Sequence, residues 1–139
     1  MSIKSNKALV LRACEATDKG DGETLLDCLH DEVTWLVPYR KDRFKHGGTM
    51  DKAGVRELIE WFFPQFSEFS FEVTNIIAEG DHVAVQARAR GVGPGSAVYS
   101  NHYHFAYEIK DGKIYYIKEY VDPFELLAYQ DQVSEISEG

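Results

Sequence analysis

The hydrophobic period of this chain changes between residues 66 and 69, and that change limits the folds the chain can adopt. Before it, apolar residues recur every three or four positions, as in amphipathic helices. After it, four segments alternate in the manner of strands and are separated by turn sequences such as Asp111-Gly112. Helices followed by an antiparallel meander define the α+β class. The predicted strands are residues 69–79, 82–90, 98–110 and 113–121.

Three helices are predicted in the first half of the chain. Residues 5–19 carry an apolar stripe that stops at Gly20, and Asp21 can cap a short second helix that ends near His30-Asp31. Asp51 can cap a third helix, which must bury one whole side. The apolar stripe of that helix is Val55, Leu58, Ile59, Phe62, Phe63 and Phe66.

The remaining segments predict shorter elements. Residues 33–37 are β-branched and aromatic and predict a strand that Pro38 ends, whereas residues 38–50 are polar and predict a mobile rim. Apolar residues after Phe124 predict a last short helix, and residues 134–139 a flexible tail.

The size and charge of the chain limit its organisation and its partners. With 139 residues, 15.8 kDa and 44% apolar residues, we expect one domain over residues 1–139, with a folded core of about 7–128. A formal charge of −8 and a pI near 5.1 argue against nucleic acid and anionic membranes, which clustered Lys and Arg would bind.

No apolar run resembles a signal peptide or a membrane span, so we expect a cytoplasmic protein. Cys14 and Cys28 occupy apolar positions of the predicted helices, which favours two buried free thiols over a disulfide or a nucleophile.

Several motifs together resemble a known family. They are Gly20-Asp21 after the first helix, the stretch from Phe44 to Gly54, Glu79-Gly80-Asp81, and the run from Tyr99-Ser100-Asn101-His102-Tyr103 to Glu119-Tyr120-Val121-Asp122. Their order resembles the SnoaL-like, ketosteroid-isomerase-related branch of the nuclear transport factor 2-like superfamily. The resemblance implies a cone in which N-terminal helices pack on a curved antiparallel sheet around a small-molecule pocket. The superfamily includes isomerases, cyclases, dehydratases, epoxide hydrolases and proteins without a reaction, so the fold alone does not select an activity.

Alternation along residues 98–110 predicts which side chains face such a pocket. Tyr99, Asn101, Tyr103, Phe105 and Tyr107 share one face, which offers apolar rings with a few polar groups.

The turn at Asp111-Gly112 decides how the next strand pairs with this one. A three-residue turn pairs Tyr103 with Glu119 and Phe105 with Ile117; a two-residue turn pairs His104 with Glu119 instead. We expect the three-residue turn, which turns Tyr115, Ile117, Glu119 and Val121 toward the pocket.

Other elements supply further walls. Trp35, Val37 and Tyr39 alternate on the first strand, and Trp61 and Phe62 of the third helix can form a floor. Two polar residues, Asn101 and Asp122, either bind ligand at the pocket edge or satisfy backbone groups at strand ends.

Glu119 is the strongest catalytic candidate, because a carboxylate on an apolar strand face is desolvated and can exchange a proton near neutral pH. Its position also resembles that of an active carboxylate in the epoxide hydrolase branch. The alternative is a buried structural contact with Arg88 or a tyrosine hydroxyl. Arg88 could neutralise Glu119 or bind an oxyanion, or it could be a surface residue with a packed stem.

Two specific activities of the superfamily fit poorly. The epoxide hydrolase pattern expects Arg and Asp two residues apart, where this chain has Arg88 and Arg90. The isomerase pattern places its base where this chain has Val37, its oxyanion tyrosine near Ala13, and its protonated acid near Phe105 or His104. These two mismatches therefore argue against epoxide hydrolysis and against steroid isomerisation.

We expect no cofactor and no metal, since His102 and His104 have a chelating spacing but no third ligand. With Tyr116, Lys118 and Tyr120 they are expected to form an outer face that pairs two chains as a homodimer.

The first functional hypothesis is a cofactor-independent isomerase, cyclase or dehydratase that transfers a proton on a small apolar carbonyl or hydroxyl compound. Glu119 would be the acid or base, and Tyr103, Asn101 or Arg88 would stabilise charge. The alternatives are a binding or accessory protein that uses the same pocket, and a protein-interaction module with an open apolar groove.

Overall fold

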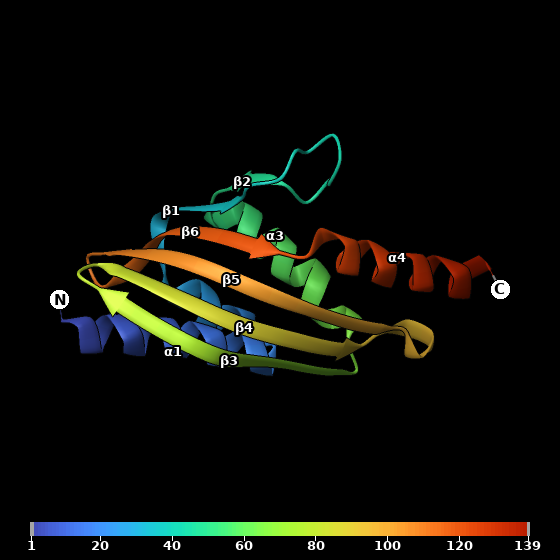
Figure 1. Cartoon of the computed structure of the whole chain (residues 1–139), viewed down its shortest axis with the longest axis horizontal. Coiled ribbons are helices and arrows are strands. Elements are labelled where there is room, and N and C mark those ends of the chain that lie inside the picture. Colours follow the sequence, from blue (N-terminus) through green and yellow to red (C-terminus); the bar gives the residue numbers. More distant parts are fainter. Residues whose placement is uncertain (1, 139) are drawn as a thin grey trace.

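The computed structural model describes residues 2–138, and its main feature is one curved sheet of six strands (Figure 1). Across the sheet the order is β2-β1-β6-β5-β4-β3. Adjacent strands are antiparallel except β1 and β6, which are parallel; β1 lies beside β6, the last strand of the meander. The strands are β1 (Leu29–Val37), β2 (Gly48–Met50), β3 (Glu68–Glu79), β4 (His82–Val92), β5 (Val98–Lys110) and β6 (Lys113–Val121). The predicted α+β cone is confirmed, with a mixed rather than a purely antiparallel sheet.

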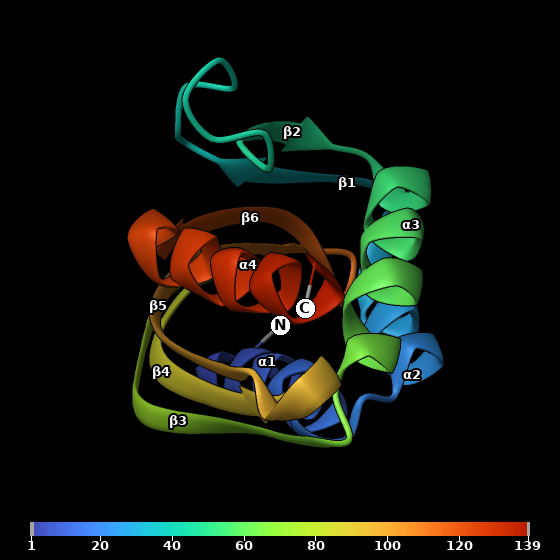
Figure 2. The same ribbon diagram turned by 90° about the vertical axis from the view of Figure 1, so that its right-hand side faces the viewer.

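The helices occupy the concave side and one end of this sheet. Figure 2 shows β3 to β6 curving around α1, with α3 along the side of the cone and α4 at its end. Two 3₁₀ turns, η1 (Phe63–Gln65) and η2 (Pro94–Ser96), connect elements. The helices are α1 (Ile3–Lys19), α2 (Gly22–Asp27), α3 (Lys52–Phe62) and α4 (Pro123–Glu138).

The predicted capping residues act as expected. The Asp21 side chain accepts a hydrogen bond from the Thr24 backbone at 3.1 Å, and Asp51 accepts one from Gly54 at 2.8 Å. Gly20 ends α1 with a φ of 67°, a left-handed conformation that suits glycine.

Several boundaries differ from the expectation. β1 starts at Leu29, so His30 and Asp31 lie in a strand. α3 ends at Phe62, because Pro64 in the following 3₁₀ turn has no backbone N–H to continue the α-helix. α4 continues to Glu138, so residues 134–138, expected to be a flexible tail, form its last turn; residue 139 lies outside the described part.

The β5–β6 hairpin corrects the predicted pairing. Asp111 and Gly112 form a two-residue turn with φ of 54° and 73°, which suits a type I′ geometry. A bulge then adds one residue to β6, so that Phe105 pairs with Glu119 and Tyr107 with Ile117. The expected pairing of Tyr103 with Glu119 is therefore wrong by two residues. Because the shift is even, the predicted faces are unchanged.

Tyr115 is the residue that this bulge displaces from its predicted face. It does not line the cavity described below; its ring packs edge-on against His30 at 5.1 Å, and Lys110 lies 4.7 Å above it. Ile114 is fully buried in its place.

Residues 38–50, expected to be a rim rather than core, contribute a core residue and a short strand. Phe44 is buried, its ring packs edge-on against Tyr39 at 5.8 Å, and residues 48–50 form β2 beside β1. This segment lies beyond β1 at the far edge of the sheet (Figure 1).

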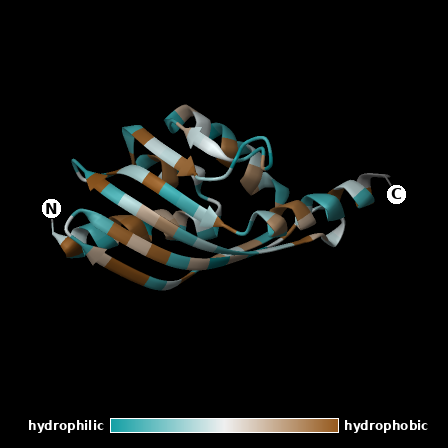
Figure 3. Cartoon of the chain, turned by 45° about the horizontal axis from the view of Figure 1, so that its top comes forward, coloured by the Kyte–Doolittle hydropathy of each residue, from teal (hydrophilic) through white to brown (hydrophobic). Residues whose placement is uncertain are grey.

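The alternation of hydrophilic and hydrophobic residues along the strands is visible in Figure 3. One face of the sheet is buried against the helices, and the other carries exposed residues such as Arg90, His102 and His104. Within residues 2–138, no helix is long and apolar enough to cross a membrane.

Cys14 and Cys28 are buried free thiols, as predicted. Burial raises the pKa of Cys14 to about 11, so it is a neutral thiol at physiological pH and a poor nucleophile.

Candidate functional site

A cavity of about 480 Å³ lies between the concave face of the sheet, α1, α3 and the segment after β1. Its volume is in the range of small-molecule sites, and most of its lining is apolar. Ten of the predicted site residues line it: Trp35, Val37, Trp61, Phe62, Tyr99, Tyr103, Phe105, Tyr107, Ile117 and Glu119.

Aromatic rings of β5 form one continuous wall. Tyr103 and Phe105 stack with centroids 5.5 Å apart and an interplanar angle of 3°, and Phe105 and Tyr107 with 5.7 Å and 26°. Trp35 of β1 meets Phe105 edge-on at 6.2 Å. The row arises because alternate residues of a strand project from the same face. It presents a flat apolar surface to any occupant.

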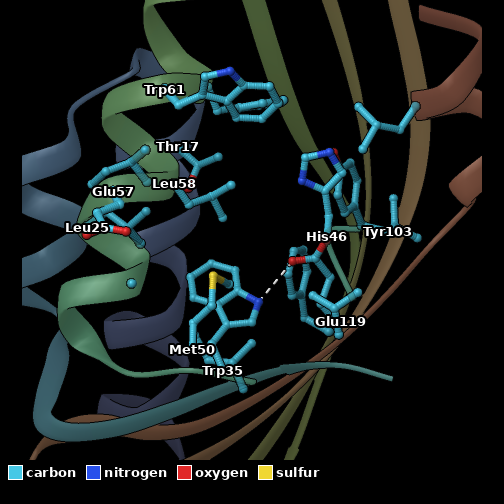
Figure 4. Close-up of a pocket in the computed structure, with 18 of the residues that line it drawn as sticks. Thr17, Leu25, Trp35, His46, Met50, Glu57, Leu58, Trp61, Tyr103 and Glu119 are labelled. Atoms are coloured by element: carbon cyan, nitrogen blue, oxygen red, sulfur yellow. Dashed lines mark hydrogen bonds between the residues drawn. The ribbon is translucent and has the colours of Figure 1, made fainter. Parts of the chain in front are cut away.

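Glu119 is the carboxylate on this wall. Trp35 Nε1–H donates a hydrogen bond of 2.9 Å to Glu119 Oε1 (Figure 4). Among the described residues, no donor reaches the second oxygen, Oε2. Burial raises the pKa of Glu119 to about 7, although the bond from Trp35 opposes this shift. Both protonation states are therefore populated near neutral pH.

Three tyrosines give the cavity neutral hydroxyl groups. Tyr99 and Tyr103 share a short hydrogen bond, and the Tyr107 hydroxyl lies 3.9 Å from Cys14 Sγ. Burial raises the pKa of all three tyrosines, so they remain protonated at physiological pH.

Arg88 does not reach the cavity, which corrects one predicted catalytic role. It lies on the outer face of β4, where its guanidinium pairs with Glu72 at 3.1 Å and 61% of the side chain is exposed. Ala87, not Arg88, pairs with Tyr103 across β4 and β5 and faces inward. Because adjacent residues of a strand face opposite ways, Arg88 cannot neutralise Glu119.

Asn101, Tyr39 and Asp122 support the site from behind and are not part of the lining. The Asn101 side chain accepts from the backbone N–H groups of His102 (2.8 Å) and Asp122 (3.1 Å), and donates to Asp122 O (3.0 Å) and Tyr99 Oη (2.9 Å). Tyr39 Oη donates to Val121 O and accepts from Val121 N. These three residues, which were expected at the ligand, do not line the cavity; their polar groups join strand ends.

We predict that Asn101→Ala lowers the free energy of unfolding by about 2 kcal/mol, because it leaves buried backbone and hydroxyl groups without partners. Urea denaturation would measure the change. The exposed neighbour Ser100→Ala serves as the control, and equal stability of the two variants would contradict this structural role.

Several residues that were not predicted from the sequence also line the cavity, among them Phe44, His46 and Phe71. The His46 ring stacks on Trp61 with centroids 5.3 Å apart, and its Nε2 lies 3.1 Å from Gln130 Nε2 of α4. Phe71 could have been found, since it alternates with Phe69 on β3. Phe44 and His46 lie in a segment with no period, so no pattern predicted their inward placement.

Within the part of the chain that the structure describes, no group of three His, Cys, Asp or Glu residues could hold a metal ion. His102 and His104 are exposed on the outer face, away from the cavity.

The curved sheet, the helix that it encloses and the aromatic cavity define a protein of the nuclear transport factor 2-like class. A family model described as a SnoaL-like domain matches residues 10–117. The chain therefore belongs to the family of SnoaL-like domains.

The proteins that resemble this chain support its fold and do not define its activity. UPF0523 protein C of Dictyostelium discoideum is 40% identical over 67 residues, which cover 46% of this chain and only 43% of that protein. AclR of Streptomyces galilaeus, named as a candidate hydroxylase, has a TM-score of 0.76 and 21% identity over 91% of this chain and 84% of its own. IdmH of Streptomyces antibioticus, named as a candidate polyketide cyclase, has a TM-score of 0.74 and 22% identity over 91% and 98%.

Proposed function

We propose that this protein is a cofactor-independent enzyme that transfers a proton on a small, mostly apolar carbonyl or hydroxyl compound bound in the cavity. The observation that carries the proposal is Glu119, a carboxylate on an aromatic wall with a pKa raised to about 7 by burial. General acid and base groups work best when their pKa lies near the working pH. Glu119 meets that condition without a charged partner.

The contact with Trp35 gives the two oxygens of Glu119 different tasks. Trp35 holds Oε1 at 2.9 Å, which orients the carboxylate and leaves Oε2 for the ligand. Oε2 takes a proton from the carbon beside a carbonyl group. The electron pair of the broken C–H bond forms a C=C bond, and the π pair of the carbonyl moves onto its oxygen, giving an enolate. In a ketone with a C=C bond between its β and γ carbons, the enolate is conjugated with that bond. As the oxygen pair re-forms the carbonyl, the C=C bond shifts to the α and β carbons and the γ carbon takes the proton back from Glu119, which completes an isomerisation.

Cyclase and dehydratase reactions can begin with the same proton transfer. IdmH, named as a candidate polyketide cyclase, shares the fold of this chain, and ring closure of a polyketide uses such a carbanion. This similarity supports a carbonyl compound as the occupant.

The bicyclic ketone 2-tetralone, whose protons beside the carbonyl are acidic, provides a direct test. We predict that the protein accelerates deuterium uptake from D₂O at these carbons, as followed by proton NMR. The rate should rise with pH up to about 7 and then level, because only deprotonated Glu119 is a base. Exchange no faster than in buffer would contradict the proposal. Binding of 2-tetralone without exchange would instead favour the ligand-binding alternative.

We also propose that two copies pair through the outer face of the sheet. Tyr120 is 44% exposed there, and Lys118 lies 5.4 Å from the centroid of its ring. An aromatic and polar surface of this kind is typical of interfaces. Light scattering should therefore give about twice the 15.8 kDa of one chain at micromolar concentration, and Tyr120→Glu should lower this mass. A wild-type mass of about 15.8 kDa would contradict the dimer.

A further inference from the structure

Three polar side chains of β5 form a hydrogen-bonded series that leads from the backbone at the end of β6 toward the cavity. It begins at Asn101, continues through the hydroxyl of Tyr99, and ends at the hydroxyl of Tyr103, which lines the cavity. Asn101 is 1% exposed and Tyr99 is 2% exposed, so water does not compete for their hydrogen bonds.

The backbone determines the orientation of the Asn101 amide. Its oxygen accepts from two N–H groups, those of His102 at 2.8 Å and Asp122 at 3.1 Å. A flipped amide would place NH₂ against both of these donors, so the flip is excluded. The Asn101 NH₂ group therefore faces Tyr99 at 2.9 Å, and the Tyr99 oxygen acts as its acceptor.

The orientation of the Asn101 amide fixes which way the hydroxyl protons of Tyr99 and Tyr103 point. Among the described residues, the only acceptor near the Tyr99 hydroxyl proton is Tyr103. If Tyr103 donated instead, the Tyr99 proton would be buried without a partner, which costs about 1 to 3 kcal/mol. Tyr99 therefore donates to Tyr103. The Tyr103 proton is left to point into the cavity, where it needs an acceptor.

The pairing of β5 with β6 places this donor beside Glu119. Phe105 pairs with Glu119 and Tyr103 with Val121, so Tyr103 and Glu119 are diagonal neighbours on one face. Such neighbours are about 7 to 8 Å apart along the sheet. Both side chains lie on the same wall of the cavity (Figure 4). A carbonyl oxygen at Tyr103 thus leaves its neighbouring carbon near Glu119.

We propose that the Tyr103 hydroxyl binds a carbonyl or enolate oxygen of the ligand, and that Tyr99 is a positioning residue that acts through Tyr103. This inference rests on the proposed pocket function and narrows its ligand class from carbonyl or hydroxyl compounds to carbonyl compounds. Three donors aligned in one direction polarise one another, so the last becomes the strongest.

The carbonyl stretch of ¹³C-labelled 2-tetralone, measured by difference infrared spectroscopy, reports a hydrogen bond to its oxygen. We expect a lower frequency when the ketone is bound to the wild type than to Tyr103→Phe, with Tyr99→Phe between them. Adding Tyr99→Phe to Tyr103→Phe should change nothing further. Tyr115→Phe is the matched control, since Tyr115 lies outside the cavity with its ring against His30, and should keep the wild-type frequency.

Affinity gives a second measurement, with tetralin as the analogue that lacks the carbonyl. Tyr103→Phe should weaken the binding of 2-tetralone about three- to tenfold, and Tyr99→Phe about two- to threefold. The affinity of both variants for tetralin should be unchanged. Unchanged tetralin binding also shows that the pocket has remained folded. If Tyr99→Phe does not fold, Tyr103→Phe alone tests the donor.

Two results would overturn the inference: equal carbonyl frequencies in the wild type and Tyr103→Phe, or an equal effect of Tyr99→Phe with and without the Tyr103 hydroxyl. Failure of 2-tetralone to bind would also overturn it, together with the proposed function. Neither measurement needs turnover. A lowered frequency without deuterium exchange would therefore support the carbonyl site while contradicting the catalytic role of Glu119.

Discussion

Replacement of Glu119 by glutamine is expected to slow deuterium exchange into 2-tetralone by a hundredfold or more, while the ketone still binds. The amide cannot accept the proton, and general acid and base catalysis is typically worth about 10² to 10⁴. Glutamine keeps the shape of the side chain, and its oxygen can still accept the bond that Trp35 donates at 2.9 Å. Proton NMR gives the exchange rate, and fluorescence of the two tryptophans that line the cavity, Trp35 and Trp61, can follow binding.

Arg88→Gln provides the matched control for this experiment. Arg88 pairs with Glu72 on the outer face, so its loss should leave exchange unchanged. For the same reason, Glu119→Gln does not strand a buried arginine and should not cause the loss of about 3 to 5 kcal/mol that follows when one partner of a buried pair is removed. Full exchange activity in Glu119→Gln would show that the base is a different residue.

The second large effect concerns stability and pH. The pKa of Glu119 is about 7 in the folded chain, against 4.5 as its ordinary value. Between these values the folded state keeps a proton that the unfolded state has released, so stability falls as pH rises, and the loss is complete above the folded pKa. We expect this one group to lower the free energy of unfolding by about 2 to 3 kcal/mol between pH 5 and pH 8.

Urea denaturation of the wild type and Glu119→Gln at both pH values isolates this contribution. The variant lacks the titrating group. Its free energy of unfolding should therefore rise by about 2 to 3 kcal/mol relative to that of the wild type between pH 5 and pH 8. Glu72→Gln, at an exposed carboxylate, should show no comparable gain. A constant difference between wild type and Glu119→Gln across this range would mean that the carboxylate is not desolvated.

Alternation along the strands predicted much of the candidate site. Tyr103, Phe105 and Tyr107 share a face because the side-chain period of a strand is two, and that face is the buried one. The same rule excludes Arg88 from the cavity, once β4 and β5 are paired so that Ala87 lies beside Tyr103. A single strand does not show which of its faces meets the helices; the pairing with its neighbours does.

Local chemistry likewise predicted the helix starts, since Asp21 and Asp51 cap α2 and α3 through their own nearby backbone. The register of the last hairpin was less accessible. A two-residue turn and a bulge each shift it by one residue in the same direction, and the bulge occurs where β6 also pairs with the parallel strand β1. That partner is about 80 residues earlier in the chain, so local sequence around the turn does not reveal it.

Residue type and local period predicted the order of helices and strands, the aromatic face of β5 and the inward direction of Glu119 on β6. The partners of those groups follow from the tertiary structure. It placed Trp35 against Glu119, Asn101 behind Tyr99, and Phe44 and His46 at the cavity. Each of these contacts joins different elements, so it depends on how the sheet curves and on what the segment after β1 covers, which no local pattern encodes.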